Sequence, residues 1–186
     1  MNESFIISKL ERFCNAAEIT GVLIMLFMAL IFQVFLNELP CPLCLLQRVG
    51  FFGVALGLLL NLRYGLQPSH YSIVILSALF TSFVALRQIA LHVVPGTGSY
   101  GFAFLGYHLY TWSFIISMII IFATTVMLGM DRQYATNFSS VPRFRALTTL
   151  LFAILLLLVG LNVISVLLEC GVSACPDNPT QYFSPF

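Results

Sequence analysis

Long apolar runs separated by short polar segments dominate the chain. A helix needs roughly 20 apolar residues to cross about 30 Å of hydrocarbon. Five runs meet this requirement, over approximately residues 16–36, 45–62, 71–91, 111–129 and 146–168. The segments between them are too short to bury a core of their own. The pattern therefore predicts an all-α, polytopic membrane helix bundle that forms a single membrane domain.

The composition agrees with a membrane location. Hydrophobic residues make up 60% of the chain and charged residues only 8%, so too little polar surface exists to cover a water-soluble globule of this size. The first apolar run follows Lys9 and Arg12, as in a signal peptide, but it is too long for one, and we expect it to be retained as a helix. A net charge of +1 indicates no particular partner. We expect contacts with membrane lipid and no nucleic-acid partner.

The positions of the basic residues predict the orientation of the helices. Six of the eight lysine and arginine residues precede the first run or lie between runs two and three or four and five, at Lys9, Arg12, Arg63, Arg132, Arg143 and Arg145. Segments 37–44, 92–110 and 169–186 contain neither lysine nor arginine. Because basic segments are retained in the cytoplasm, the N-terminus is predicted inside and the C-terminus outside.

Four of the five cysteines lie in these predicted outer segments, at Cys41, Cys44, Cys170 and Cys175, whereas Cys14 lies at the inner end of the first helix. Disulfides persist in an oxidising outer compartment. Three pairings of four cysteines exist; proximity in the chain favours Cys41–Cys44 and Cys170–Cys175, and exchange between the pairs stays open as the function. A four-thiolate zinc site is disfavoured by the long spacing of the second pair, so we expect no metal.

The Cys41-Pro42-Leu43-Cys44 motif stands at the predicted start of the second helix. Unpaired backbone N–H groups and the helix dipole stabilise a thiolate at this position, and Pro40 and Pro42 stiffen the turn before it. These features favour a redox pair. A simple structural disulfide is the alternative, although so short a loop gains little from closure entropy.

Arg48 follows Cys44 by four residues, so the two side chains share a helix face about 6 Å apart along the axis. A guanidinium there would favour the thiolate and could donate to a carbonyl oxygen of a quinone; snorkelling to the lipid headgroups is the alternative. Gln47 is adjacent. Arg87 and Gln88 lie at a similar depth on the third helix, where they are candidates for a second wall of a quinone pocket. For Arg87, snorkelling to the lipid headgroups is an equally strong alternative.

The run Cys41-Pro42-Leu43-Cys44-Leu45-Leu46-Gln47-Arg48 resembles the disulfide bond formation protein B (DsbB) family. Arg87-Gln88 with Leu91, and Phe104-Leu105-Gly106 followed by Trp112, continue the resemblance over roughly residues 10–130. It implies a four-helix core within residues 1–130, located in the bacterial inner membrane. It also implies an oxidoreductase that takes electrons from a periplasmic DsbA-like thioredoxin-fold protein and passes them to ubiquinone or menaquinone. Cys41 and Cys44 would be the quinone-linked pair, with Cys44 facing the quinone beside Arg48.

The chain departs from the family pattern in two places. Segment 92–110 is short and lacks the second cysteine pair that meets the soluble partner in well-known members. Residues 131–186 add a cytoplasmic loop, a fifth helix and an outer tail with Cys170 and Cys175. We expect this tail pair to replace the missing one, so that electrons pass from the partner through Cys170–Cys175 to Cys41–Cys44. A structural clip is the alternative.

Two other functions compete with this hypothesis. One is a membrane reductase of quinones or disulfides resembling vitamin K epoxide reductase, whose helix order and placement of the cysteine pair differ. The other is a non-enzymatic membrane scaffold whose disulfides are structural. Cysteine alkylation distinguishes them, because a redox pair must appear reduced when quinone is withheld.

Overall fold

The computed structural model describes residues 2–35, 39–93, 101, 103–135, 142–171 and 175. The elements in chain order are α1 (Asn2–Phe35), α2 (Pro42–Tyr64), α3 (Pro68–His92), strands β1 (Ala103–Phe104) and β2 (Tyr107–His108), α4 (Leu109–Leu128), the 3-10 helix η1 (Asp131–Ala135) and α5 (Pro142–Cys170). Each of α1 to α5 contains a stretch long and apolar enough to cross a membrane. The predicted five-helix membrane bundle is therefore confirmed, whereas its orientation stays a prediction.

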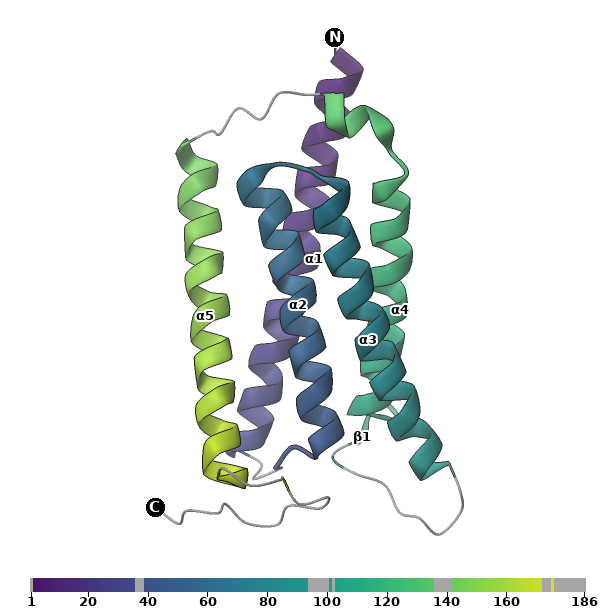
Figure 1. Cartoon of the computed structure of the whole chain (residues 1–186), viewed down its shortest axis with the longest axis vertical. Helices are drawn as coiled ribbons and strands as arrows, with labels where there is room; N and C mark the ends of the chain where they lie inside the picture. The colour runs from purple at the N-terminus through teal and green to yellow at the C-terminus, as the bar shows by residue number, and fades with distance from the viewer. Residues whose placement is uncertain are drawn as a thin grey trace.

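The helices run alongside one another, and the bundle has two distinct ends (Figure 1). At the end that we call the disulfide end, α2 begins, α5 finishes and the hairpin of β1 and β2 precedes α4. The other end, called the opposite end, holds the first turns of α1, the α2–α3 connection and η1. The segments predicted to face outward thus contribute their described parts to one end of the molecule.

Helix boundaries differ from the predicted apolar runs where polar residues continue a helix or proline starts one. The first helix extends back to Asn2, well before residue 16, because a helix can continue beyond its apolar, membrane-crossing part. The second begins at Pro42 rather than near Cys44. Proline is favoured in the first helical position, since its missing N–H has no partner there in any case. Pro68 starts α3 in the same way.

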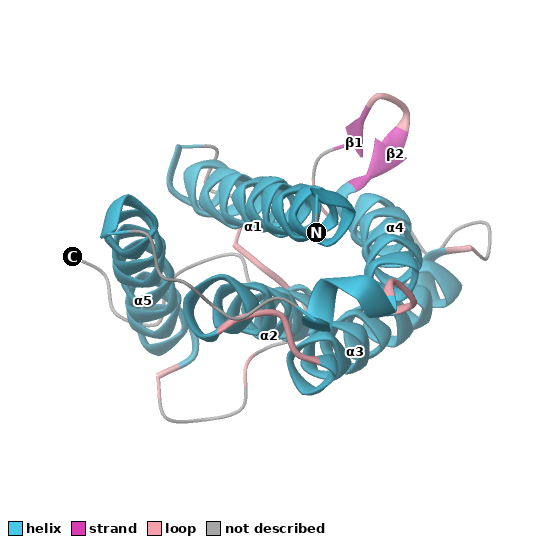
Figure 2. Cartoon of the chain, turned by 90° about the horizontal axis from the view of Figure 1, so that it is seen from above, coloured by secondary structure: helices cyan, strands magenta, loops and turns pink. Residues whose placement is uncertain are grey.

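The helices pack as a four-helix core with α5 at its side. In Figure 2, α5 stands next to α1 and α2, away from α3 and α4. Its buried apolar residues Leu151, Leu155 and Leu158 join the same core as Ile19 and Leu58. This 3-4 spacing places one face of α5 against the bundle, and the face continues toward the disulfide end with polar residues.

Glycine allows α2 and α3 to approach closely. A side chain at Gly53 would collide with Ser77, and one at Gly57 would collide with Val74 and the backbone of His70. Close contact through small residues is a common way for membrane helices to associate. This contact fixes α3 against α2 and so helps to place the disulfide end of α3 beside the start of α2.

Candidate active site

A disulfide between Cys41 and Cys44 stands at the N-terminus of α2, with a Cα–Cα distance of 5.0 Å. Cys41 is the N-cap residue, and its Sγ accepts a hydrogen bond from the backbone N–H of Cys44 at 3.1 Å. The sulfur therefore accepts the N-cap hydrogen bond that a serine or aspartate oxygen accepts at the start of many helices. Once the disulfide is reduced, this N–H and the helix dipole favour a thiolate over a thiol.

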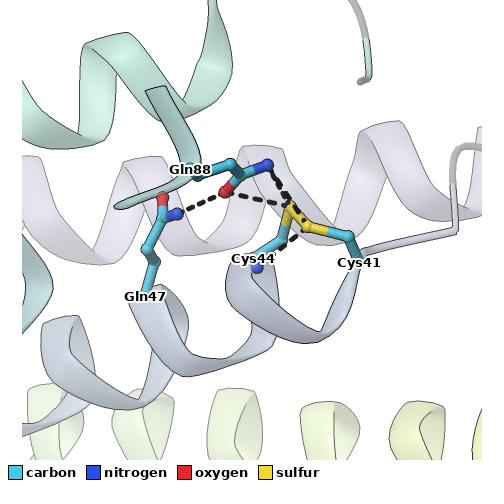
Figure 3. Close-up of a disulfide and its surroundings, with 4 residues drawn as sticks. All are labelled: Cys41, Cys44, Gln47 and Gln88. Atoms are coloured by element: carbon cyan, nitrogen blue, oxygen red, sulfur yellow. Dashed lines mark hydrogen bonds between the residues drawn. A yellow bond between two sulfur atoms is a disulfide. The ribbon is translucent and has the colours of Figure 1, made fainter. Parts of the chain in front are cut away.

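Gln88 of α3 contacts both sulfur atoms of this disulfide (Figure 3). Its Nε2 lies 3.3 Å from Cys41 Sγ and 3.4 Å from Cys44 Sγ. Gln47 fixes the orientation of this amide, because Gln47 Nε2 donates to Gln88 Oε1 at 2.6 Å. Both glutamines are almost fully buried. The Gln88 amide therefore holds an N–H donor against both sulfur atoms, where it would stabilise the negative charge of a thiolate after reduction.

Arg48 lies one turn beyond Cys44, and helices on both sides of it hold its guanidinium. Nη1 donates to Gln33 Oε1 of α1 at 2.8 Å and to Asn162 Oδ1 of α5 at 3.0 Å. Nη2 donates to the backbone oxygen of Ala29 at 3.2 Å. These contacts keep a half-buried cation inside the bundle, which is where intramembrane charges are usually found.

Glu169 places a buried carboxyl group at this end of α5. Its side chain is only 2% exposed, and neither carboxyl oxygen has a hydrogen-bond partner among the described residues. The carboxyl group lies close enough to Arg48 for the two to interact electrostatically. A buried carboxyl group without hydrogen bonds is costly, and the guanidinium of Arg48 offsets part of that cost.

A cavity with about 950 Å³ of empty space, part of it open to the surroundings, borders the disulfide. Cys44, Gln47 and Arg48 form a polar part of its wall. The remainder is mainly apolar and comes mostly from α1 and α4, with Met25, Met28, Phe32, Leu109, Trp112 and Ile116. Met28 in this wall is exposed, in keeping with a cavity that is partly open. The mix of apolar walls with a few polar groups is typical of small-molecule sites.

The hairpin of β1 and β2 supports the aromatic side of the cavity. Its turn has left-handed backbone at Leu105 (φ 51°) and Gly106 (φ 83°), the conformation that tight two-residue hairpins require. Trp112 Nε1 donates to the backbone oxygen of Phe104 at 2.9 Å. Trp112, the only tryptophan in the sequence, is thereby fixed where it lines the cavity.

The second disulfide joins Cys170, the last residue of α5, to Cys175, as proximity in the chain predicts. Its Cα–Cα distance is 4.7 Å. Cys170 is 3% exposed, whereas Cys175 is half-buried and therefore the more accessible of the two. Cys14, the predicted inner thiol, is free and lies in α1. The end of α5 and the start of α2 lie at the same end of the bundle (Figure 1).

The structure brings together most, but not all, of the predicted site residues. Cys44, Gln47 and Arg48 share the cavity wall. Gln88 contacts the sulfurs and does not belong to the cavity lining, so its placement suits a partner of the disulfide better than a second wall of a pocket. Arg87, one residue earlier on α3, is exposed and outside the lining.

Sequence reasoning missed Gln33, Asn162 and Glu169, the residues that surround Arg48. Each is a polar residue at the edge of, or within, an otherwise apolar helix, which was a usable signal because such residues tend to face the bundle interior. Their common partner was hidden, since nothing in a single sequence tells which helices are neighbours.

Residues 11–100 match the family model described as "Disulfide bond formation protein DsbB". The matched segment contains most of α1, all of α2 and α3, and with them Cys41, Cys44, Arg48 and Gln88. The hairpin, α4, α5 and the second disulfide lie beyond it. Comparisons with curated proteins and with solved structures gave no match.

Proposed function

Because residues 11–100 make this chain a DsbB-family protein, we propose that it is a thiol:quinone oxidoreductase that reoxidises a periplasmic thioredoxin-fold thiol oxidase. Family and structure together support the broader description, a multi-pass membrane oxidoreductase of disulfide-bond formation. One observation carries the finer proposal: Cys44 of the α2 disulfide and Arg48 line the same apolar cavity. We place the protein in the bacterial inner membrane with its disulfide end on the periplasmic side.

The cavity suits a quinone, which has a flat apolar ring and two carbonyl oxygens. Met25, Phe32 and Ile116 would pack on the ring. Arg48 would donate to a carbonyl oxygen, with Gln47 as a second polar group in the same wall. Ubiquinone and menaquinone share these features, and either would fit this description. In this proposal Gln88 acts on the sulfurs rather than on the quinone.

The reaction balances as a two-electron, two-proton exchange. A reduced Cys41–Cys44 pair holds two thiols; when its disulfide forms again, two electrons and two protons leave the pair and convert the quinone to the quinol. Cys44 is the sulfur that lines the cavity, so we assign it the contact with the quinone. The N–H of Cys44, which contacts Cys41 Sγ, and the Gln88 amide, which contacts both sulfurs, favour thiolate in the reduced pair.

Electrons would reach this pair through the tail disulfide. A thiolate of the partner attacks Cys175, the more accessible sulfur, and forms a mixed disulfide while Cys170 leaves as thiolate. The second thiol of the partner then resolves the mixed disulfide, which leaves the partner oxidised and Cys170 and Cys175 reduced. This dithiol exchanges with Cys41–Cys44 in the same two steps and returns to the disulfide.

Anaerobic quinone reduction by the purified protein tests this proposal. The wild type, supplied with a reduced thioredoxin-fold partner, should convert a short-chain ubiquinone to quinol with one partner disulfide formed per quinol. Cys44→Ser should abolish the reaction, whereas Cys14→Ser should leave it unchanged, because Cys14 lies in α1 outside the cavity lining. No quinone reduction by the wild type would overturn the proposed function.

The tail relay has its own test in the double variant Cys170→Ser, Cys175→Ser. We expect it to lose oxidation of the partner yet still reduce quinone when a small dithiol supplies the electrons. Full turnover with the partner would show instead that the tail disulfide is a structural clip and that the partner attacks Cys41–Cys44 directly.

A further inference from the structure

Helix α5 lies outside the family match, yet it contacts the residue at the centre of the proposed quinone site. Asn162 of α5 is 6% exposed, and its Oδ1 accepts from Arg48 Nη1 at 3.0 Å. Its own helix fixes the amide, because Asn162 Nδ2 donates to the backbone oxygen of Leu158 at 3.0 Å. The amide oxygen is therefore already directed at Arg48.

A second contact from α5 acts through Gln33 of α1. Gln33 is 1% exposed; its Nε2 donates to Ser165 Oγ of α5, and its Oε1 accepts from Arg48 Nη1 at 2.8 Å. Ser165 thus orients the amide whose oxygen holds the guanidinium. Both side-chain acceptors of Nη1 are fixed by α5, one directly and one through Gln33.

These contacts decide between two positions open to an arginine at this depth. A long arginine side chain near the end of a membrane helix tends to extend to the lipid headgroups. Two oriented oxygens inside the bundle, with the carboxyl group of Glu169 nearby, favour the inward position instead. The inward position is the one in which Arg48 lines the cavity.

We propose that α5 is part of the quinone site, with Asn162 and Ser165 as positioning residues that hold the guanidinium of Arg48 in the cavity wall. This inference rests on the proposed function. It assigns the added helix a role in binding quinone, separate from the role of its tail in accepting electrons. Arg48 keeps the contact with the quinone, and the two α5 residues act only through it.

Fluorescence of Trp112 provides a readout that does not depend on turnover. Trp112 is the only tryptophan and lines the cavity, so a bound short-chain ubiquinone should quench it. We expect Asn162→Leu to raise the Kd from this titration, and the KM for quinone, about tenfold. The kcat at saturating quinone should change less than twofold. Ser165→Ala should give a smaller rise, and Ser165→Thr, which keeps the hydroxyl, should restore the wild-type Kd.

Thr148→Val is the matched control. Thr148 is a buried polar residue near the other end of α5, and among the described residues its hydroxyl donates within its own helix, to the backbone oxygen of Arg145. Its replacement should leave the Kd for quinone within twofold of the wild type. A Kd raised as much by Thr148→Val as by Asn162→Leu would reveal a general loosening of α5 and overturn the inference.

The combination with Arg48→Met shows whether the α5 residues act through Arg48. In the Arg48→Met protein, Asn162→Leu should cause no further change in Kd, because the group that it positions is gone. An undiminished tenfold effect there would overturn the inference. So would a wild-type Kd and KM in both Asn162→Leu and Ser165→Ala while the wild type reduces quinone. If the wild type neither quenches nor reduces quinone, the proposed function fails, and this inference fails with it.

Discussion

The two ends of the bundle use buried polar residues in opposite ways. At the opposite end, Asn61 Nδ2 donates to Asn15 Oδ1 at 3.1 Å, and Asn15 Nδ2 donates to the Tyr71 hydroxyl at 3.1 Å. That hydroxyl donates onward to Gln133 Oε1 at 3.0 Å. All four side chains are at most 2% exposed. The chain of hydrogen bonds therefore closes within the protein and joins α1, α2, α3 and η1.

At the disulfide end the polar groups also bond to one another, but several of them in addition face a sulfur atom or the cavity. Gln88 directs its N–H at two sulfurs, and Arg48 and Gln47 border a cavity. Fully satisfied buried networks rigidify a structure, whereas groups directed at a cavity or a reactive atom are available for chemistry. In the function that we propose, one end holds the four-helix core together and the other end carries the reaction.

Tyr71→Phe should disrupt the hydrogen-bond network at the opposite end and leave the structure of the disulfide end unchanged. It removes the hydroxyl that accepts from the Asn15 amide and donates to Gln133 Oε1, and we expect the loss of these two buried hydrogen bonds to cost about 1–3 kcal/mol of unfolding free energy. Thermal unfolding of the purified protein, followed by circular dichroism, measures the loss. Ser72→Ala is the control, because Ser72 is exposed and its hydroxyl bonds only within α3.

The quinone affinity of the same Tyr71→Phe protein tests whether the two ends of the bundle are independent. Since the network at the opposite end shares none of its four residues with the cavity lining, Trp112 quenching should give a Kd within twofold of the wild type. A clear rise in Kd would show that the two ends are coupled and that the division proposed for them is wrong.

Gln88→Leu should have a smaller effect, on the reactivity of Cys44 at the disulfide end. The N–H that faces Cys44 Sγ would be lost, so less of the reduced Cys44 would be thiolate at neutral pH. We expect alkylation of Cys44 by iodoacetamide at pH 7 to slow about fivefold, equivalent to about 1 kcal/mol. The Cys41→Ser background makes Cys44 the thiol of this pair that reacts. An unchanged rate would mean that the Gln88 amide only packs against the sulfurs.

Arg87→Gln should have the smallest effect. Arg87 was predicted beside Gln88 as part of a quinone pocket, but its side chain is exposed and lies outside the cavity lining. We expect less than a twofold change in the Kd and KM for quinone. A tenfold loss of quinone affinity would show that Arg87 contributes to the quinone site. It would also mean that quinone binds over a wider surface of α3.

Much of the fold follows from the sequence, because each membrane-crossing helix needs one long apolar run and each run was visible. The convergence of Cys44 and Arg48 followed as well, since a spacing of four residues on one helix fixes a shared face. The contacts of Arg48 with Gln33 and Asn162 could not be derived in this way. They join three helices, and their geometry depends on packing between helices rather than on spacing within one.

The cavity is partly open, and Met28 of its wall is exposed within the membrane-crossing part of α1, which favours an opening toward the lipid. A molecule that arrives there comes sideways out of the lipid. Its supply is then set by its mole fraction in the bilayer, and the amount dissolved in water has little influence. Extra lipid or detergent added at a constant amount of quinone would dilute the substrate in two dimensions. Rates measured in micelles and in vesicles become comparable only when quinone is expressed per lipid or detergent molecule.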